Sequence, residues 1–209
     1  MQSKAAVTGN ESVKYSSIQI EDGLSQISVV DIFQDSKGYL WFATRNGLNR
    51  YDGRDFKVFR HEKGNPGSLS DNHVTSLAED NNGNLWIGTR HGLSKLDLSS
   101  EKVTAYVDSL AYKMFEDGIR ALALDANGRV LIATPHGLFM AIDDDKFESI
   151  LPEVKGTIVE GLAVTKDGRI FVGSTTNGLY ILNKNHKPIK HFDSHNGSLP
   201  TNDIKEIYE

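Results

Sequence analysis

The chain has 209 residues and a formal net charge of −5, with 38% hydrophobic and 24% charged residues. This composition is typical of a soluble globular protein, and the lack of a long basic tract argues against nucleic acid as a partner. The absence of cysteine excludes disulfides, thiolate metal sites and a cysteine nucleophile. No apolar run approaches the ~18 residues of a membrane helix, and residues 1–15 lack the apolar core of a signal peptide. We therefore expect a cytosolic chain, or one from which a signal has been removed.

One segment recurs along the chain at a nearly constant spacing. Residues 35–48 read DSKGYLWFATRNGL, and residues 80–93 read DNNGNLWIGTRHGL. Two looser copies follow, DANGRVLIATPHGL at 125–138 and TKDGRIFVGSTTNGL at 165–179. The first glycines of the copies are Gly38, Gly83, Gly128 and Gly168, which gives spacings of 45, 45 and 40 residues. A period of this size indicates one supersecondary unit that is repeated and stacked.

The second copy shows what one unit contains. Residues 73–79 carry apolar Val74 and Leu77 among β-favouring neighbours, and residues 85–89 form a short continuous apolar run. Residues 93–97 alternate apolar and polar, and residues 102–107 are more polar. Turn-forming residues, such as the DNNG at 80–83, separate these stretches, so four short antiparallel strands are predicted. Four such strands per unit are typical of a propeller blade. We therefore predict an all-β fold, a β-propeller of four-stranded antiparallel blades.

The repeats divide the chain into about four blades and part of a fifth. Residues 1–24 are predicted to form an N-terminal segment with an outer strand at 13–20, and residues 199–209 the first strand of a fifth blade. We therefore expect a piece of a longer propeller, with closure of the four blades on themselves as the alternative. The four blades are predicted at residues 25–60, 70–107, 118–150 and 157–192.

Equivalent positions in the four copies suggest structural roles. The large apolar residue three positions after each turn glycine is predicted to pack blade against blade, and the tryptophans among them are interpreted as core residues. A hydroxyl at the end of the same strand is predicted to hold the backbone of the next turn. The large residues are Trp41, Trp86, Leu131 and Phe171, and the hydroxyls belong to Thr44, Thr89, Thr134 and Ser174.

The first two copies follow the pattern I-x-x-D-x-x-G-x-L-W-[IF]-[GA]-T-x-x-G-L closely, through residues 32–48 and 77–93. This pattern resembles the two-component regulator propeller repeat, which builds sensor domains of bacterial hybrid histidine kinases and of some diguanylate cyclases. The third copy departs from it with Leu131 in place of tryptophan. The fourth departs further, with Phe171 for tryptophan and Thr165 for the turn aspartate. The resemblance extends from about residue 24 to the C-terminus.

The resemblance implies a non-catalytic sensor module that faces the periplasm and recognises a small-molecule cue, often a glycan breakdown product. It also implies a membrane-anchored full-length protein, with a transmembrane helix and a kinase or cyclase module after residue 209. A quinoprotein-like or lyase-like propeller enzyme is one alternative, and a protein-interaction propeller is another, because a fold does not settle a function. No acid–base pair or nucleophile constellation can be defined, so neither catalytic residues nor a cofactor are predicted.

The candidate binding face is the one formed by the links between blades and by the second hairpin turn of each blade. Polar residues there could recognise hydroxyls or a carboxylate on a small ligand. The alternative is that these residues are polar because turns face water. The candidate binding residues are Arg45, Asn46, Asn72, His73, Arg90, His91 and His136.

Metal binding is not predicted. The seven histidines show no tight metal-ligand spacing, although His91 and His136 occupy equivalent turn positions in adjacent repeats. The Asp-x-x-Gly turns offer too few oxygen ligands for calcium, and they are interpreted as hairpin turns.

Self-association is predicted from the open ends of such an array. Exposed apolar blade faces and unpaired strand edges drive association. We therefore expect the chain to pair with a second copy, with residues 13–20 of one chain against a strand edge of the other.

Overall fold

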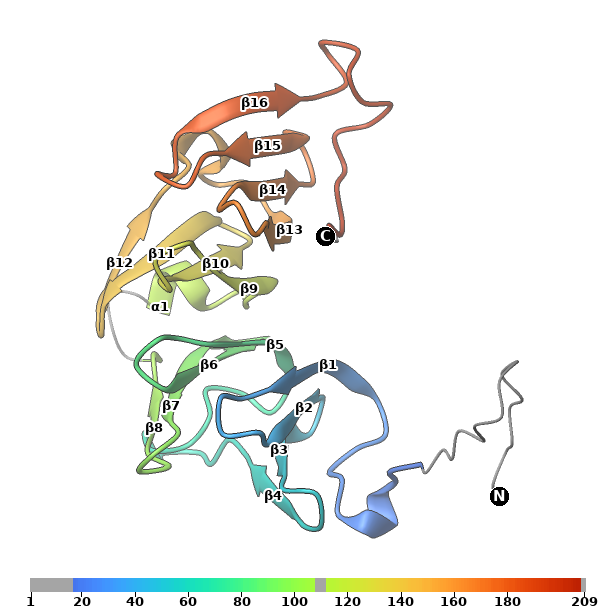
Figure 1. Cartoon of the computed structure of the whole chain (residues 1–209), viewed down its shortest axis with the longest axis vertical. Helices are drawn as coiled ribbons and strands as arrows, with labels where there is room; N and C mark the ends of the chain where they lie inside the picture. Colours follow the sequence, from blue (N-terminus) through green and yellow to red (C-terminus); the bar gives the residue numbers. More distant parts are fainter. Residues whose placement is uncertain (1–16, 108–111, 208–209) are drawn as a thin grey trace.

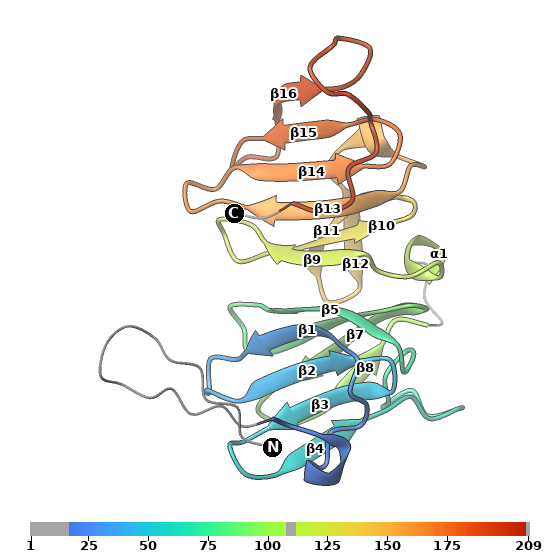
Figure 2. The ribbon, with the colours of Figure 1, turned by 90° about the vertical axis from the view of Figure 1, so that its right-hand side faces the viewer.

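The structure is a computed structural model that describes residues 17–107 and 112–207, and most of its regular structure is β-strand. Four sheets follow one another along the chain, and in each sheet four antiparallel strands pair in chain order. The sheets lie around an arc with the first strand of each on the inside (Figure 1), and they stack face to face (Figure 2). This arrangement confirms the predicted all-β propeller of four-stranded antiparallel blades. Blades 1 and 4 lie at opposite ends of the arc, so these four blades do not close on themselves.

Each blade is one sheet, and its strands are joined by short turns. Blade 1 contains β1 (Val29–Gln34), β2 (Leu40–Thr44), β3 (Gly47–Tyr51) and β4 (Phe56–Phe59). Blade 2 contains β5 (Val74–Glu79), β6 (Asn84–Thr89), β7 (Gly92–Asp97) and β8 (Val103–Ala105). Blade 3 contains β9 (Ala121–Leu124), β10 (Val130–Thr134), β11 (Gly137–Asp143) and β12 (Lys146–Ser149), and the short helix α1 (Tyr112–Phe115) precedes it. Blade 4 contains β13 (Val159–Val164), β14 (Ile170–Ser174), β15 (Leu179–Leu182) and β16 (Pro188–Phe192), with the 3-10 helix η2 (Pro152–Val154) before it.

Large apolar residues join neighbouring blades, as predicted for three of the four repeat positions. Trp41 belongs to an apolar cluster that spans blades 1 and 2, Trp86 to one that spans blades 2 and 3, and Leu131 to one that spans blades 3 and 4. All three are buried. Phe171 differs, because it is only half-buried and lies under the guanidinium of Arg169.

The predicted hydroxyl contacts are present in all four blades. In each case the side-chain oxygen at the end of the second strand donates to the carbonyl of the next turn glycine, which satisfies a turn carbonyl. The distances are 2.8 Å from Thr44 to Gly47, 2.8 Å from Thr89 to Gly92, 3.1 Å from Thr134 to Gly137 and 3.4 Å from Ser174 to Gly178.

The aspartate and tryptophan of each full repeat are hydrogen-bonded to one another. Trp41 Nε1 donates to Asp35 Oδ2 at 2.7 Å, and Trp86 Nε1 donates to Asp80 Oδ2 at the same distance. Asp35 Oδ1 also accepts two backbone N–H groups of its own turn. One carboxylate therefore shapes the hairpin turn and satisfies the buried indole, which explains why both residue types recur together.

Blade 3 replaces the missing indole with other donors. Arg129 Nη2 lies 2.7 Å from Asp125 Oδ2, and His186 Nε2 lies 3.0 Å from the same oxygen. His186 comes from the β15–β16 turn, so this contact also links blades 3 and 4. Burial raises the pKa of Asp125, but hydrogen bonds from Arg129 and Asn127 outweigh it and hold the pKa below its ordinary value.

This lowered pKa predicts a pH dependence of stability. A carboxyl whose pKa is lower in the folded state stabilises the fold above its unfolded pKa, which is about 3.9, and this contribution is lost as the pH falls through the folded pKa. We expect the urea midpoint of the unmodified chain to fall more steeply below about pH 4 than that of Asp125→Asn. Asp145→Asn, at an exposed carboxylate of the same blade, is the control. Parallel midpoint curves for the unmodified chain and Asp125→Asn would contradict the prediction.

The predicted outer strand at the N-terminal end differs from the structure. Residues 13–16 lie outside the described residues, residues 17–19 are not a strand, and η1 (Ile20–Asp22) is a 3-10 helix. Asp22 Oδ2 accepts the backbone N–H of Gln19 at 2.8 Å, and Gly23 ends the helix with φ +107°. This local hydrogen bonding satisfies the backbone without a neighbouring strand.

At the C-terminal end, residues 203–207 are not a strand, and residues 208–209 lie outside the described part of the chain. The segment nevertheless docks on blade 4 as the residues just before β9 dock on blade 2. Ile204 N donates to Ser174 O at 2.9 Å, and Ile119 N donates to Thr89 O at the same distance. The predicted first strand of a fifth blade at residues 199–209 is therefore absent over the described residues of this segment, which join no ladder with a neighbouring strand.

One face of β1 is apolar and exposed. Ile32 is 61% exposed, whereas Leu77, which occupies the same place one blade later, is 6% exposed within the core between blades 1 and 2. Ile27 and Val30, on the same segment, are also exposed. A face of this kind favours association with another apolar surface.

We propose that a second copy of the chain covers this face. Size-exclusion chromatography with light scattering at micromolar concentration should give more than the mass of one chain, and Ile32→Lys should reduce it toward that mass. Ile189→Lys, at an exposed isoleucine of β16, is the matched control and should leave the mass unchanged. A one-chain mass for the unmodified protein would rule this association out.

Candidate functional site

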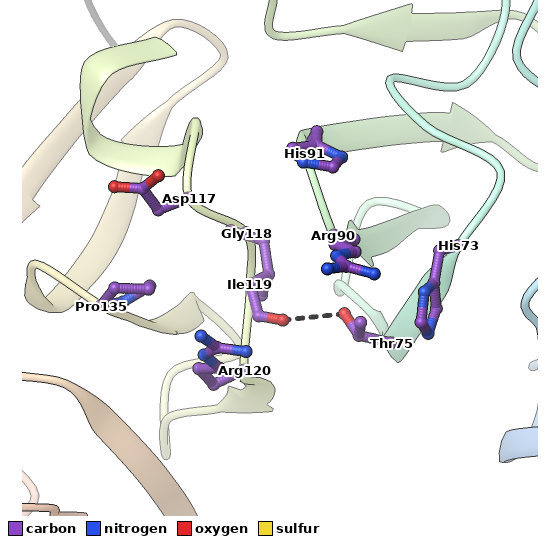
Figure 3. Close-up of a pocket in the computed structure, with 9 residues that line it drawn as sticks. All are labelled: His73, Thr75, Arg90, His91, Asp117, Gly118, Ile119, Arg120 and Pro135. Atoms are coloured by element: carbon purple, nitrogen blue, oxygen red, sulfur yellow. Dashed lines mark hydrogen bonds between the residues drawn. The ribbon is translucent and has the colours of Figure 1, made fainter.

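A cleft of about 620 Å³ opens between blades 2 and 3, on the side where the blade links and the second hairpin turns lie. Blade 2 contributes residues of the link, of β5 and of the β6–β7 turn. Blade 3 contributes the segment that leads into β9 and the β10–β11 turn (Figure 3). The volume is in the range of small-molecule sites, about 300–1,000 Å³. The lining residues are His73, Thr75, Arg90, His91, Asp117, Gly118, Ile119, Arg120 and Pro135.

The two sides of the cleft are fixed to one another through the backbone. Thr75 Oγ1 donates to Ile119 O at 2.8 Å, as Figure 3 shows, and Ile119 N donates to Thr89 O at 2.9 Å. The backbone of Gly118 approaches blade 2 so closely that a Cβ there would lie 2.5 Å from Arg90 O. The spacing across the cleft is therefore set by the hydrogen bond of the Thr75 hydroxyl and by close contacts between backbone atoms.

Two arginines enter the cleft, one from each side (Figure 3). Arg120 Nε lies 3.8 Å from Glu160 Oε1 of blade 4, which partly balances its charge. Arg90 lies in the β6–β7 turn and is exposed, and no described carboxylate lies within ion-pair distance of its guanidinium. Arg90 therefore presents an uncompensated positive charge to the cleft.

His73 lies on the blade 2 side and is half-buried. Burial, followed by the nearby charges of Arg45 and Arg90, lowers the pKa of His73 below its ordinary value, and Asp71 opposes this shift. Its imidazole is therefore neutral at neutral pH, with one nitrogen to donate and one to accept a hydrogen bond.

The carboxylates near the cleft already have cationic or imidazole partners. Asp71 Oδ2 lies 3.3 Å from His91 Nδ1. Asp117 Oδ2 lies 3.0 Å from His136 Nε2, at ion-pair distance but without the angles of a hydrogen bond. The balance of charge on the cleft wall is therefore positive.

Three of the seven predicted binding residues, His73, Arg90 and His91, line this cleft. Arg45 is not a lining residue, but its charge acts on His73. His136 lies at the edge, where it contacts Asp117. The blade 3 side of the cleft thus receives no lining residue from the predicted set.

The two predicted asparagines hold backbone instead. Asn72 Oδ1 accepts the N–H of His61 at 2.8 Å, and its carbonyl accepts the N–H of Gly47 at 2.7 Å. Asn46 Nδ2 donates to Ser25 O at 3.2 Å. The Asn46 amide and the Asn72 carbonyl each connect a second hairpin turn to the adjacent link, and neither residue lines the cleft.

Arg120 and Thr75 are lining residues that sequence reasoning did not select. They occupy the same place in consecutive copies, since 120 − 75 = 45 is the repeat period. In blade 2 this place coincides with a shift in strand register between Val74 and Ser76, where the residue between them has no partner on β6. A comparison of the copies at this position would have revealed the charge change from threonine to arginine.

The hollows on the opposite side of the blades are weaker candidates. One of them, about 690 Å³, lies at the Asp-x-x-Gly turns of blades 1 and 2, and its lining contains no cationic residue. Its acidic groups are engaged, since Ser36 N donates to Glu79 Oε2 at 2.7 Å and Asp35 accepts from Trp41. No group of three metal-ligating side chains is found within residues 17–107 and 112–207.

Comparison with known protein families identifies the repeat. The two-component regulator propeller family matches residues 23–46 and 68–91. These segments run from the blade link through the Asp-x-x-Gly turn to the second hairpin turn of blades 1 and 2. Blades 1 and 2 thus each contain one segment that matches the repeat of this family. The second matched segment ends at His91, so this repeat supplies the blade 2 side of the cleft.

Known proteins that resemble these propeller repeats include sensors and enzymes. A curated relative, "Histidine kinase P4" of Formosa agariphila, is 46% identical over 61 residues, which are 29% of this chain and 4% of that protein. The extracellular domain of the hybrid two-component system BT3049 from B. thetaiotaomicron is 25% identical, with a TM-score of 0.71 over 88% of this chain and 27% of that one. Virginiamycin B lyase from Staphylococcus aureus is 11% identical, with a TM-score of 0.64 over 98% of this chain and 66% of that one, a likeness of fold alone.

The propeller repeats thus span a small part of the sensor proteins they match. The described residues contain no helix long and apolar enough to cross a membrane. The family match and the BT3049 domain support a propeller module of the kind found in extracellular sensor domains.

Proposed function

We propose that this chain is the ligand-sensing propeller of a bacterial signal-transduction protein, and that it binds a small polar cue in the cleft between blades 2 and 3. The observation that carries this proposal is the cleft itself. It combines fixed walls, a volume suited to a small molecule and a set of polar side chains from two blades. Ligand sites of proteins share these features.

Binding without catalysis is the activity that these side chains favour. The hydroxyl of Thr75 is committed to Ile119 O, so it is not poised as a nucleophile. Asp117 contacts His136, and His91 contacts Asp71. Neither pair belongs to a group of catalytic side chains. The similarity to virginiamycin B lyase is a similarity of fold alone. The side chains of the cleft give the enzyme alternative no support.

The cellular setting is proposed from the relatives. A histidine kinase is the favoured output module, because the curated relative bears that name, and a diguanylate cyclase is the alternative output. The periplasm is the proposed location, in line with the extracellular sensor domain that shares this fold. A glycan breakdown product or another small polar molecule is the proposed cue.

The test uses the full-length protein in its own host with a transcriptional readout across carbon sources. Arg90→Glu should abolish the response to the active source while protein abundance is unchanged. Arg54→Glu, at an exposed arginine of the β3–β4 turn outside the cleft, is the control and should respond normally. A normal response in Arg90→Glu would remove the cleft from the sensing mechanism, and binding of a protein partner would then be the better account.

A further inference from the structure

We infer that the cleft between blades 2 and 3 recognises an oxyanion, a carboxylate or phosphate group on its ligand, and that Arg90 is the principal partner of that group. This inference rests on the proposed function and specifies the chemistry of its ligand.

The balance of charges singles out Arg90. Of the charged groups that line the cleft, Asp117 lies against His136, and Arg120 lies 3.8 Å from Glu160. Arg90 has no acidic partner within the part of the chain that the structure describes. Its guanidinium is thus the group with free capacity for an anion, and its planar fork suits the two oxygens of a carboxylate or phosphate.

The backbone that carries Arg90 is held in place. Arg90 N donates to His73 O at 2.9 Å, and Arg90 O lies against the backbone of Gly118 on the other side of the cleft. An arginine on a fixed turn loses less entropy on binding than one on a mobile loop. The turn therefore presents Arg90 at a defined position between His73 and Arg120.

The neutral imidazole of His73 lies beside the positive charge of Arg90. His73 faces Arg45, Arg90 and His91, which disfavour its protonation, and Asp71, which favours it, while burial keeps it neutral. A bound oxyanion adds negative charge beside the same imidazole and favours its protonated form. Anion binding and proton uptake at His73 are therefore coupled, so the affinity should rise as the pH falls through the pKa of His73.

The experiment uses the 209-residue chain and three matched probes, galactose, galacturonate and galactose 1-phosphate. These probes share a sugar frame and differ in charge, so they separate oxyanion recognition from sugar recognition and a carboxylate from a phosphate. Calorimetry gives the affinity, and the ring resonances of His73 in NMR spectra report its pKa with and without each probe.

The expected result is millimolar or tighter binding of at least one acidic probe, with a rise in the pKa of His73 and little binding of galactose. Arg90→Gln should weaken this binding by about tenfold or more, the worth of a charge-assisted hydrogen bond. The affinity of Arg90→Lys should fall between those of the unmodified chain and Arg90→Gln, because lysine keeps the positive charge but lacks the planar guanidinium. Arg54→Gln, at an exposed arginine of the β3–β4 turn outside the cleft, should change the affinity by about twofold or less.

The alternative outcomes are distinct. Equal binding of galactose and the acidic probes would overturn the inference and leave small-molecule sensing in place. Binding that Arg90→Gln leaves unchanged, with an unaltered melting temperature, would also overturn it. Failure of both acidic probes to shift any cleft resonance would overturn it as well, and the host response experiment would then decide the proposed function separately.

Discussion

Replacement of Asp35 by alanine is expected to lower the free energy of unfolding by about 3 kcal/mol. Asp35 is 4% exposed, and its carboxyl group accepts the indole N–H of Trp41 at 2.7 Å and the backbone N–H groups of Lys37 and Tyr39 at 3.0 and 2.9 Å. Alanine leaves these donors without their acceptor, and a buried unsatisfied group costs about 1–3 kcal/mol. Urea unfolding followed by circular dichroism measures the loss.

A double-mutant cycle with Trp41→Phe tests whether the pair acts as a unit. Phenylalanine keeps a ring in the core but removes the indole donor, and it should cost about 2 kcal/mol. The free energy of unfolding of the double variant should fall by about 1 kcal/mol less than the sum of the two single losses. The reason is that each single change leaves the other group of the pair without its hydrogen-bond partner. Asp55→Ala, at an exposed turn carboxylate, is the control for charge loss. Additive losses would show that the hydrogen bond contributes no coupling.

Replacement of Gly118 by alanine is expected to cost about 3 kcal/mol or more. The residue has φ +93°, a conformation that costs an L-residue about 1–2 kcal/mol. In addition, the new Cβ would lie 2.5 Å from Arg90 O, a backbone atom that no side-chain rotation can move away. The two sides of the cleft must then separate, so the variant should also shift the NMR resonances of His73.

Gly38→Ala is the matched control for that substitution. Gly38 has φ +89°, close to that of Gly118, but no described atom lies within 4 Å of the position of its Cβ. It should lose about 1–2 kcal/mol from backbone strain alone. The difference between the two variants measures the contact between Gly118 and Arg90. Equal losses would mean that the blades adjust without cost at this point.

The four-blade architecture could be predicted because it depends on local pattern. The Asp-x-x-Gly turns, the continuous apolar second strand and the alternating third strand each follow from a few consecutive residues. Repetition at a fixed period then implies stacking, because a single blade cannot bury both of its faces. The terminal segments were harder to predict. Ile20–Asp22 forms a 3-10 helix through local backbone hydrogen bonds and one to the Asp22 side chain, and Ile204 docks on blade 4 without joining a ladder.

The roles of individual repeat residues could be predicted only in part. Burial of Trp41 and Trp86 followed from their recurrence, but their bonds to Asp35 and Asp80 depend on the path of the turn relative to the second strand. The replacement of the indole donor by Arg129 and His186 in blade 3 is even harder to predict from the sequence. His186 reaches Asp125 from 61 residues further along the chain, because the turn of blade 4 lies beside that of blade 3.

The amino-acid sequence by itself determined the blades, their strand order, the turns and the repeat family, since these reside in short-range periodicity. It also placed His73, Arg90 and His91 together on the predicted binding face, and these three residues line one side of the cleft. Only the tertiary structure decided that Arg120 and Asp117 complete a cleft with them, and that Asn72 does not. The reason is physical. A site between two blades depends on their separation, which is set by the contact of Gly118 with Arg90 and by the hydrogen bond from Thr75 to Ile119, and no local pattern encodes these long-range contacts.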